Sequence, residues 1–92
     1  MKVVINTCYG GFDLSEKALE LYRKKTNGKE GFYAFEIPRD HPVLVRIVEE
    51  WGEDAAGPHA ELKIVEVPDE VNWFIMDYDG DEWVAERHRT WR

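Results

Sequence analysis

The sequence has little cysteine, no long apolar run and no basic residue in its most acidic stretch. Cys8 is the one cysteine among 92 residues, so no disulfide can form within the chain, whereas a secreted domain of this size usually needs several. No stretch approaches the roughly 18 apolar residues of a membrane span, and residues 1–6 lack the apolar core of a signal peptide. These absences predict a single domain over residues 1–92 in a reducing cytoplasm.

The charge is unevenly distributed. Nineteen acidic residues against twelve basic ones give a net charge of −7, and residues 66–86 hold eight acids and no lysine or arginine. Such a surface repels phosphate backbones, which argues against nucleic acid as a partner. An acidic run most often forms a solvated face that keeps a protein soluble. The alternative is that this stretch presents a charge pattern to a partner protein.

Two segments have helical periodicity. Asp13 stands three residues before a glutamate, as in a capping box, and apolar residues then recur at helical spacing to about Lys25. Asp40 is placed to cap a second helix with Pro42 in its first turn, and this helix is expected to run to Trp51. Two helices are therefore expected in the first half of the chain.

The remaining apolar segments predict strands. Residues 2–7 and 62–67 are compact apolar runs, and residues 32–37 suggest a shorter strand or an extended connector. Asp79-Gly80 tolerates positive φ and separates the alternating segments 72–78 and 82–88, which predicts a β-hairpin. The order predicts an α+β fold, a two-layer sandwich with two helices on one face of a small mixed sheet ending in a C-terminal β-hairpin.

The glycine turn after the first strand is the best candidate for a ligand site. Glycines allow a ligand to approach the backbone, and a helix N-terminus can hold an anion. The candidate binding residues are Tyr9, Gly10, Gly11 and Phe12. The segment matches no phosphate-loop or dinucleotide motif, and Asp13 opposes phosphate. The alternative is a structural turn that needs positive φ at one glycine.

Three arginines are further candidates. If the last strand continues through them, Arg87 and Arg89 share one strand face beside tryptophans, an arrangement that suits a phosphate-bearing or planar ligand such as a nucleotide. Alternatively they pair with Glu82 and Glu86. Arg39 precedes the second helix and joins the glycine turn if the sandwich brings both to one end of the sheet.

Catalytic and metal-binding residues are less well supported. Cys8 near a helix N-terminus could act as a nucleophile, but the spacing of the three histidines places none beside it, so a structural thiol is the alternative. Asp77, Asp79 and Asp81 resemble the start of a calcium loop that lacks its later glycine and glutamate. We therefore assign no catalytic residue, no metal and no cofactor.

Two motifs carry a resemblance to a known family. Residues 2–12 (KVVINTCYGGF) and 82–91 (EWVAERHRTW) resemble a family of small uncharacterised proteins of tailed bacteriophages and prophages. Family members often have glycine where Asp13 stands, which weakens the case for phosphate capture there. The resemblance implies no named activity, but phage accessory proteins of this size often antagonise host pathways. It therefore favours a binding protein over an enzyme.

Three functions follow from these observations. The leading hypothesis is a non-enzymatic accessory protein of the bacterial host cytoplasm that sequesters a nucleotide-derived host immune signal, as a homo-oligomer. The second is an acidic inhibitor that binds a host protein. The third is a small thiol- or carboxylate-dependent hydrolase.

Overall fold

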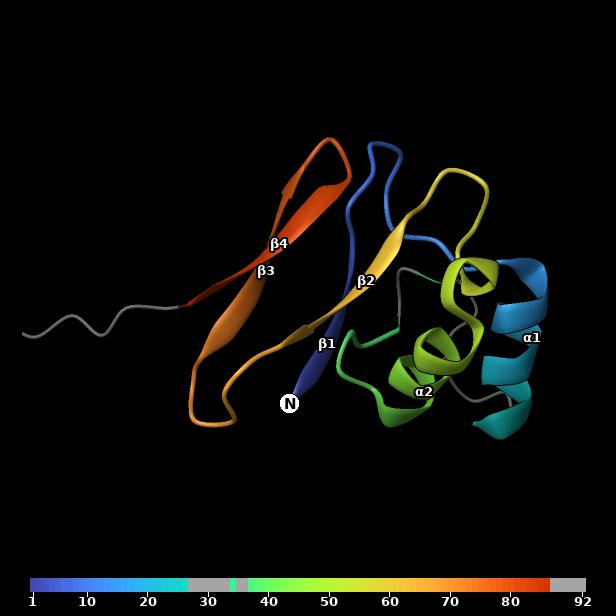
Figure 1. Cartoon of the computed structure of the whole chain (residues 1–92), viewed down its shortest axis with the longest axis horizontal. Coiled ribbons are helices and arrows are strands. Elements are labelled where there is room, and N and C mark those ends of the chain that lie inside the picture. The colour runs from blue at the N-terminus through green and yellow to red at the C-terminus, as the bar shows by residue number, and fades with distance from the viewer. Residues whose placement is uncertain (27–33, 35–36, 87–92) are drawn as a thin grey trace, which may run out of the picture.

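The computed structural model describes residues 1–26, 34 and 37–86. These residues form an α+β domain that ends in a β-hairpin, as the sequence predicts (Figure 1). The elements in chain order are β1 (Lys2–Asn6), α1 (Glu16–Lys25), α2 (Pro42–Trp51), the short 3-10 helix η2 (Gly52–Ala55), β2 (Leu62–Glu66), β3 (Trp73–Tyr78) and β4 (Asp81–Glu86). None of these helices is both long and apolar enough to cross a membrane.

The strands form two antiparallel pairs, β1 with β2 and β3 with β4, rather than one mixed sheet. Both helices cover one face of the β1–β2 pair, as predicted, and the β3–β4 hairpin lies against its other side (Figure 1). The β1–β2 pair is therefore the middle layer of the domain.

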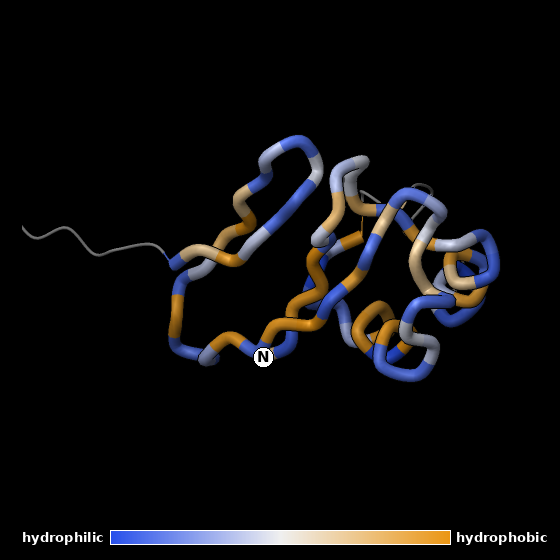
Figure 2. Tube along the Cα trace, turned by 45° about the horizontal axis from the view of Figure 1, so that its top comes forward, coloured by the Kyte–Doolittle hydropathy of each residue, from blue (hydrophilic) through white to orange (hydrophobic). Residues whose placement is uncertain are grey.

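Alternation along β1 explains its central place. Val3 and Ile5 are buried against the hairpin, while Val4 points the other way into the helical core. In Figure 2 the apolar segments of β1 and α2 lie inside the molecule, whereas the tip of the hairpin is hydrophilic. The prediction that this strand is buried on both faces is confirmed.

The outer edge of β1 is occupied by groups from outside its sheet. The amide of Val4 donates to the carbonyl of Arg39 at 2.8 Å, and the amide of Asn6 donates to Oε1 of Glu82 at 2.8 Å. Because these amides already have acceptors, β4 does not continue the β1–β2 ladder, and the hairpin packs against it instead.

Helix α1 begins two residues later than it would if Asp13 were its N-cap. Ser15 is the N-cap, and its hydroxyl accepts from the amide of Ala18 at 3.3 Å. Leu14 forms a bridge with Ala56 and is buried, which keeps the chain extended beyond Asp13. A tertiary contact thus decides the start of the helix.

Helix α2 begins with Pro42 as predicted, but its cap is His41 and not Asp40. The imidazole Nδ1 of His41 accepts from the amide of Val43 at 3.1 Å. The same ring meets the buried ring of Tyr22 edge-on, with centroids 5.3 Å apart, so this cap also joins α2 to α1.

The strand expected over residues 32–37 is described at two positions only. Ala34 and Ile37 are both buried, and the amide of Ile37 donates to the carbonyl of Ala34 at 3.1 Å. This bond closes a turn, so these two positions do not belong to a strand. The other positions of that prediction lie outside the described residues.

Candidate functional site

The glycine turn contacts the tip of the β3–β4 hairpin. Asp79 and Gly80 form that tip with φ angles of 54° and 93°, which confirms the predicted two-residue turn. The amide of Gly10 donates to the carbonyl of Asp79 at 3.2 Å. A Cβ atom on Gly80 would lie only 2.2 Å from the amide nitrogen of Gly11. The absence of a Cβ atom at these glycines therefore allows the turn and the hairpin tip to approach each other closely.

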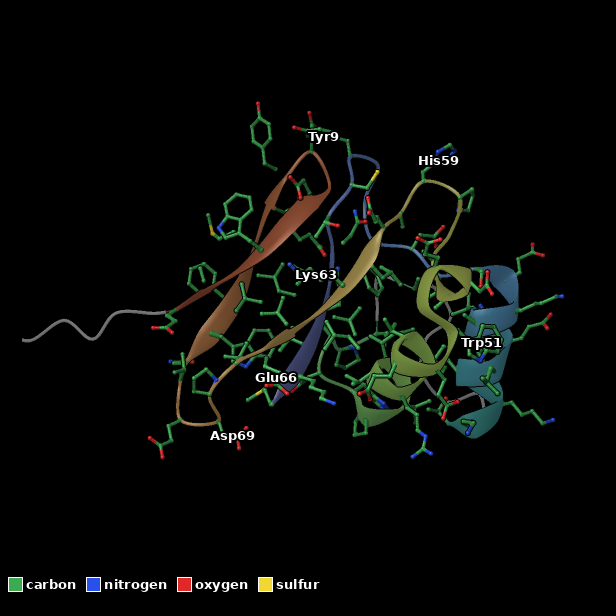
Figure 3. All side chains as sticks on the ribbon, viewed as in Figure 1. Tyr9, Trp51, His59, Lys63, Glu66 and Asp69 are labelled. Carbon is green, nitrogen blue, oxygen red and sulfur yellow. The ribbon has the colours of Figure 1, made fainter. Side chains whose placement is uncertain are left out.

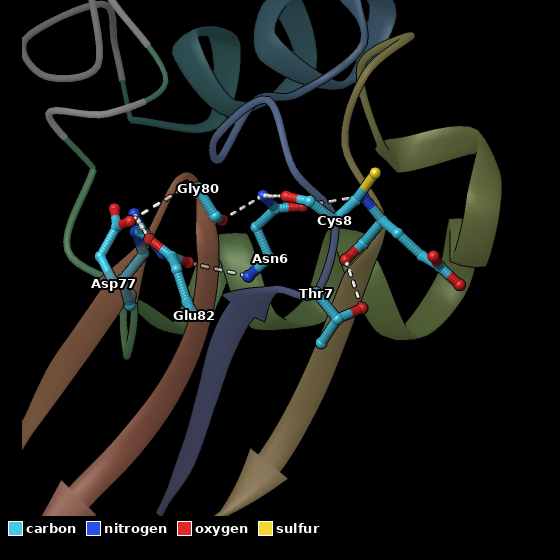
Figure 4. Close-up of polar contacts among 8 residues, drawn as sticks. Asn6, Thr7, Cys8, Asp77, Gly80 and Glu82 are labelled. Carbon is cyan, nitrogen blue, oxygen red and sulfur yellow. Dashed lines mark hydrogen bonds and ion pairs between the residues drawn. The ribbon is translucent and has the colours of Figure 1, made fainter.

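The side chain of Asn6 forms hydrogen bonds to three segments at this end of the molecule (Figure 4). Its fully buried side chain donates to the carbonyls of Cys8 at 2.7 Å and Gly80 at 2.6 Å, and it accepts from the amide of Glu61 at 2.8 Å. The amide group thus joins the glycine turn, the hairpin tip and the start of β2. All of its bonds are made within the protein, so Asn6 is a structural residue.

A buried ion pair lies beside Asn6. The guanidinium of Arg39 donates to both carboxylate oxygens of Glu82, at 2.5 and 2.9 Å, and the side chains are only 15% and 5% exposed. The guanidinium carbon also lies 3.7 Å from the centre of the Phe12 ring. This bidentate, stacked geometry orients Arg39 toward Glu82 and the core.

The surface at the glycine turn is a shallow depression of about 620 Å³ that is open to solvent. It is lined by Tyr9, Gly10, Gly11 and Gly80 together with the carboxylates of Asp77 and Asp79. The Tyr9 side chain is 66% exposed, at the same end of the molecule as His59 (Figure 3). None of the described residues lining the depression carries a positive charge, so its electrostatics disfavour a phosphate.

The hairpin also presents an apolar outer face. Trp73 and Ile75 pack inward on the β1–β2 layer, while Met76, Tyr78 and Trp83 point away from it and are 40%, 68% and 46% exposed. Met76 and Trp83 are direct cross-strand partners, and Tyr78 is the next residue on the same face. These three side chains, called the outer face below, form a contiguous exposed apolar surface.

Cys8 and His59 line one pocket of about 420 Å³, together with Glu53 and Glu61. Sequence spacing gave no sign of this proximity. The thiol donates to the carbonyl of its neighbour Tyr9 at 3.4 Å, and no thiol–imidazole hydrogen bond is formed in the described part of the chain. In residues 1–26, 34 and 37–86, no three His, Cys, Asp or Glu side chains are arranged to hold a metal ion.

The structure therefore brings part of the predicted site together. Tyr9, Gly10 and Gly11 lie at one depression, while Phe12 and Arg39 contact each other and do not line it. Arg87 and Arg89 lie outside the described residues. The alternative that these two arginines pair with Glu82 and Glu86 therefore lies outside the described residues as well. Among the described residues, Arg39 binds Glu82.

Comparison with known proteins adds no relative. A scan against protein-family models and searches of curated proteins and of solved structures found no match to this chain. The functional argument therefore depends on the site geometry alone.

Proposed function

We propose that the protein is a non-enzymatic binding module that recognises a partner protein through the outer face of its hairpin. The observation that carries this proposal is the exposure of Met76, Tyr78 and Trp83 side by side on one face. Aromatic residues and methionine are the types enriched in the cores of protein interfaces, and tryptophan and tyrosine dominate binding hot spots.

The hairpin is held rigidly enough to serve as a recognition surface. Its inner residues Trp73, Ile75 and Val84 pack on the β1–β2 layer, and its tip is bonded to Asn6. Its buried Glu82 is fixed by the ion pair described above. A surface that is ordered before binding loses little conformational entropy in the complex.

The charges around the outer face indicate a basic partner. Asp81 lies on the outer face and Asp79 at the hairpin tip, and residues 66–86 contain no lysine or arginine. Such acidic groups accelerate association with a basic surface, and binding to that surface weakens as salt rises. This supports the acidic-inhibitor hypothesis among those that the sequence suggests. On the resemblance to phage proteins, we propose a cytoplasmic protein of the bacterial host as this partner.

The test is affinity capture from bacterial lysate with three baits at low and high salt. The baits are the wild type, Trp83→Thr, which removes the largest ring of the outer face but keeps a strand-forming residue, and the control Glu20→Gln. Glu20 is exposed on α1, on the other side of the β1–β2 layer. We expect a partner that wild type and the control retain at low salt and that Trp83→Thr loses.

Two results would contradict the proposal. One is the absence of any specifically captured protein even at low salt. The other is a partner that Trp83→Thr captures as well as the wild type does, because that partner would bind elsewhere. Circular dichroism of the variant must first show that the hairpin still folds.

A nucleotide-derived ligand is our second proposal. The depression beside Tyr9 has room for one, and the exposed ring of Tyr9 can stack on a base. Because Asp77 and Asp79 also line it, the phosphates would depend on cations such as Arg87 and Arg89, which lie outside the described residues. Isothermal titration with cyclic and ADP-ribose-type nucleotides tests this proposal, and uniformly flat titrations would refute it.

A further inference from the structure

Strand β4 presents acidic residues on both of its faces. Side chains alternate along a strand, so Asp81 and Trp83 share the outer face while Glu82 between them points inward. The inward carboxylate is bound by Arg39, whose guanidinium also lies on the ring of Phe12. The inner side of this strand thus contains a complete group of carboxylate, arginine and aromatic ring.

The outer side of β4 contains two of the same three parts. Asp81 is the direct cross-strand partner of Tyr78, so their Cβ atoms lie about 5 Å apart. Trp83 follows two residues along the same face, a step of about 7 Å. A carboxylate therefore lies between two exposed rings, within reach of one planar cation.

The described arginines do not complete this outer group. Arg39 is held by Glu82, and Arg46 pairs with Glu50 at 3.0 Å on α2. Arg23 belongs to α1, which lies on the other side of the β1–β2 layer from the hairpin (Figure 1). Within residues 1–26, 34 and 37–86, no arginine is paired with Asp81 or stacked on Trp83.

We infer that the outer face binds an arginine side chain of the partner, with its guanidinium on the Trp83 ring and hydrogen-bonded to Asp81. This inference rests on the proposed function and names the chemistry that the hairpin recognises. A guanidinium suits the site better than an ammonium, because its planar fork can stack on a ring while donating to a carboxylate. Tyr78 would contact the aliphatic stem.

The test uses capped peptides of equal length on a glycine–serine background. They carry arginine, lysine or citrulline at the same positions, and citrulline keeps the shape of arginine without its charge. Binding to the full chain is followed by the shifts of the backbone amide signals of β3 and β4 in two-dimensional NMR, which remain present in the Trp83 variants. The variants are Asp81→Asn, Trp83→Thr, Trp83→Phe and the distant control Glu20→Gln.

The expected order of affinity is arginine, then lysine, then citrulline, with about a tenfold difference between the first and the last. Asp81→Asn and Trp83→Thr should each weaken arginine-peptide binding about threefold to fivefold. Trp83→Phe keeps a ring and should recover most of the affinity, and Glu20→Gln should leave it unchanged.

Equal binding of the arginine and citrulline peptides would overturn the inference, and so would equal loss of affinity in Asp81→Asn and Glu20→Gln. A partner protein that Trp83→Thr loses but Asp81→Asn retains would leave the proposed function standing and refute the arginine site. A Trp83-dependent dimer seen by analytical ultracentrifugation would also overturn it, because a second copy would then cover the outer face.

Discussion

Replacing Glu82 with alanine tests whether the buried ion pair fixes the hairpin to the rest of the fold. The carboxylate accepts from both guanidinium nitrogens of Arg39 and from the amide of Asn6. Alanine removes all of these acceptors at once. It leaves a guanidinium that is largely buried and a fully buried amide without partners.

The expected cost is a large part of the total stability. Removing one partner of a buried ion pair costs about 3–5 kcal/mol, and this range includes the desolvated groups left behind. Arg39 retains some exposure and can recruit water, so we expect a loss near the lower end, about 3 kcal/mol. A chain of 92 residues has a free energy of unfolding of roughly 5–14 kcal/mol.

Urea denaturation followed by tryptophan fluorescence and far-UV circular dichroism measures this loss. Glu82→Gln keeps an acceptor for the Asn6 amide and should cost less than alanine. The matched control is Glu50→Ala, which breaks an ion pair whose side chains are exposed, and it should cost less than about 1 kcal/mol.

A double-mutant cycle with Arg39→Ala completes the test. The coupling energy between Arg39 and Glu82 should be about 1–3 kcal/mol, because the two charges share one buried site. A loss below about 1 kcal/mol for Glu82→Ala, or a coupling energy near zero, would refute the argument that this pair holds the hairpin in place.

Three further predictions follow from other contacts. Gly80→Ala should destabilise the fold by more than Gly11→Ala in urea denaturation. Both glycines have positive φ, but only a Cβ atom at Gly80 would contact backbone, at 2.2 Å from the amide nitrogen of Gly11. Equal losses of stability would show that backbone strain from positive φ alone explains both effects. Asn6→Ala should cost about 2–4 kcal/mol and accelerate amide exchange at the hairpin tip, because it breaks three partly buried hydrogen bonds. Unchanged exchange at the tip would contradict this prediction. The hydrogen bond to Glu49 raises the pKa of Lys2 above its ordinary value of 10.5, so this ion pair stabilises the fold at lower pH. Its contribution should disappear as the pH rises through the raised pKa, and the difference in stability between wild type and Lys2→Met should then vanish. A difference that persists above the raised pKa would refute this prediction.

The hairpin and the strands could be predicted because their signals are local. Asp79-Gly80 needs only the positive φ that these two residues tolerate, and alternation places Trp73 and Ile75 on one face whatever they pack against. The burial of β1 on both faces follows from its β-branched run in the same way.

The helix caps could not be predicted because distant segments decide them. Asp13 fits a capping box, yet Leu14 is held extended by its bridge to Ala56, and the cap moves to Ser15. His41 is an uncommon cap, and its contact with the ring of Tyr22 joins two helices that are distant in sequence. At both N-caps, tertiary contacts override the local helix propensity.

The glycine turn was identified correctly as unusual, but its partner could not be foreseen. Gly10 and Gly11 have the positive φ that a ligand loop would need, and the hairpin tip uses that freedom instead. Some seventy residues separate the two segments in the sequence. The packing of the hairpin on β1 and the hydrogen bonds of Asn6 and Gly10 to the hairpin tip bring them together, which periodicity cannot reveal.

The acidic stretch shows how much alternation alone could have revealed. Glu82 looks like one more solubilising acid, yet it points inward and needs a buried cation, while Asp81 and Trp83 beside it point outward. Both faces of the hairpin carry large apolar side chains, but a two-stranded ribbon can pack only one face against β1–β2. The second apolar face contributes nothing to the core that the described residues form. Its rings are therefore better explained by recognition of a partner than by folding.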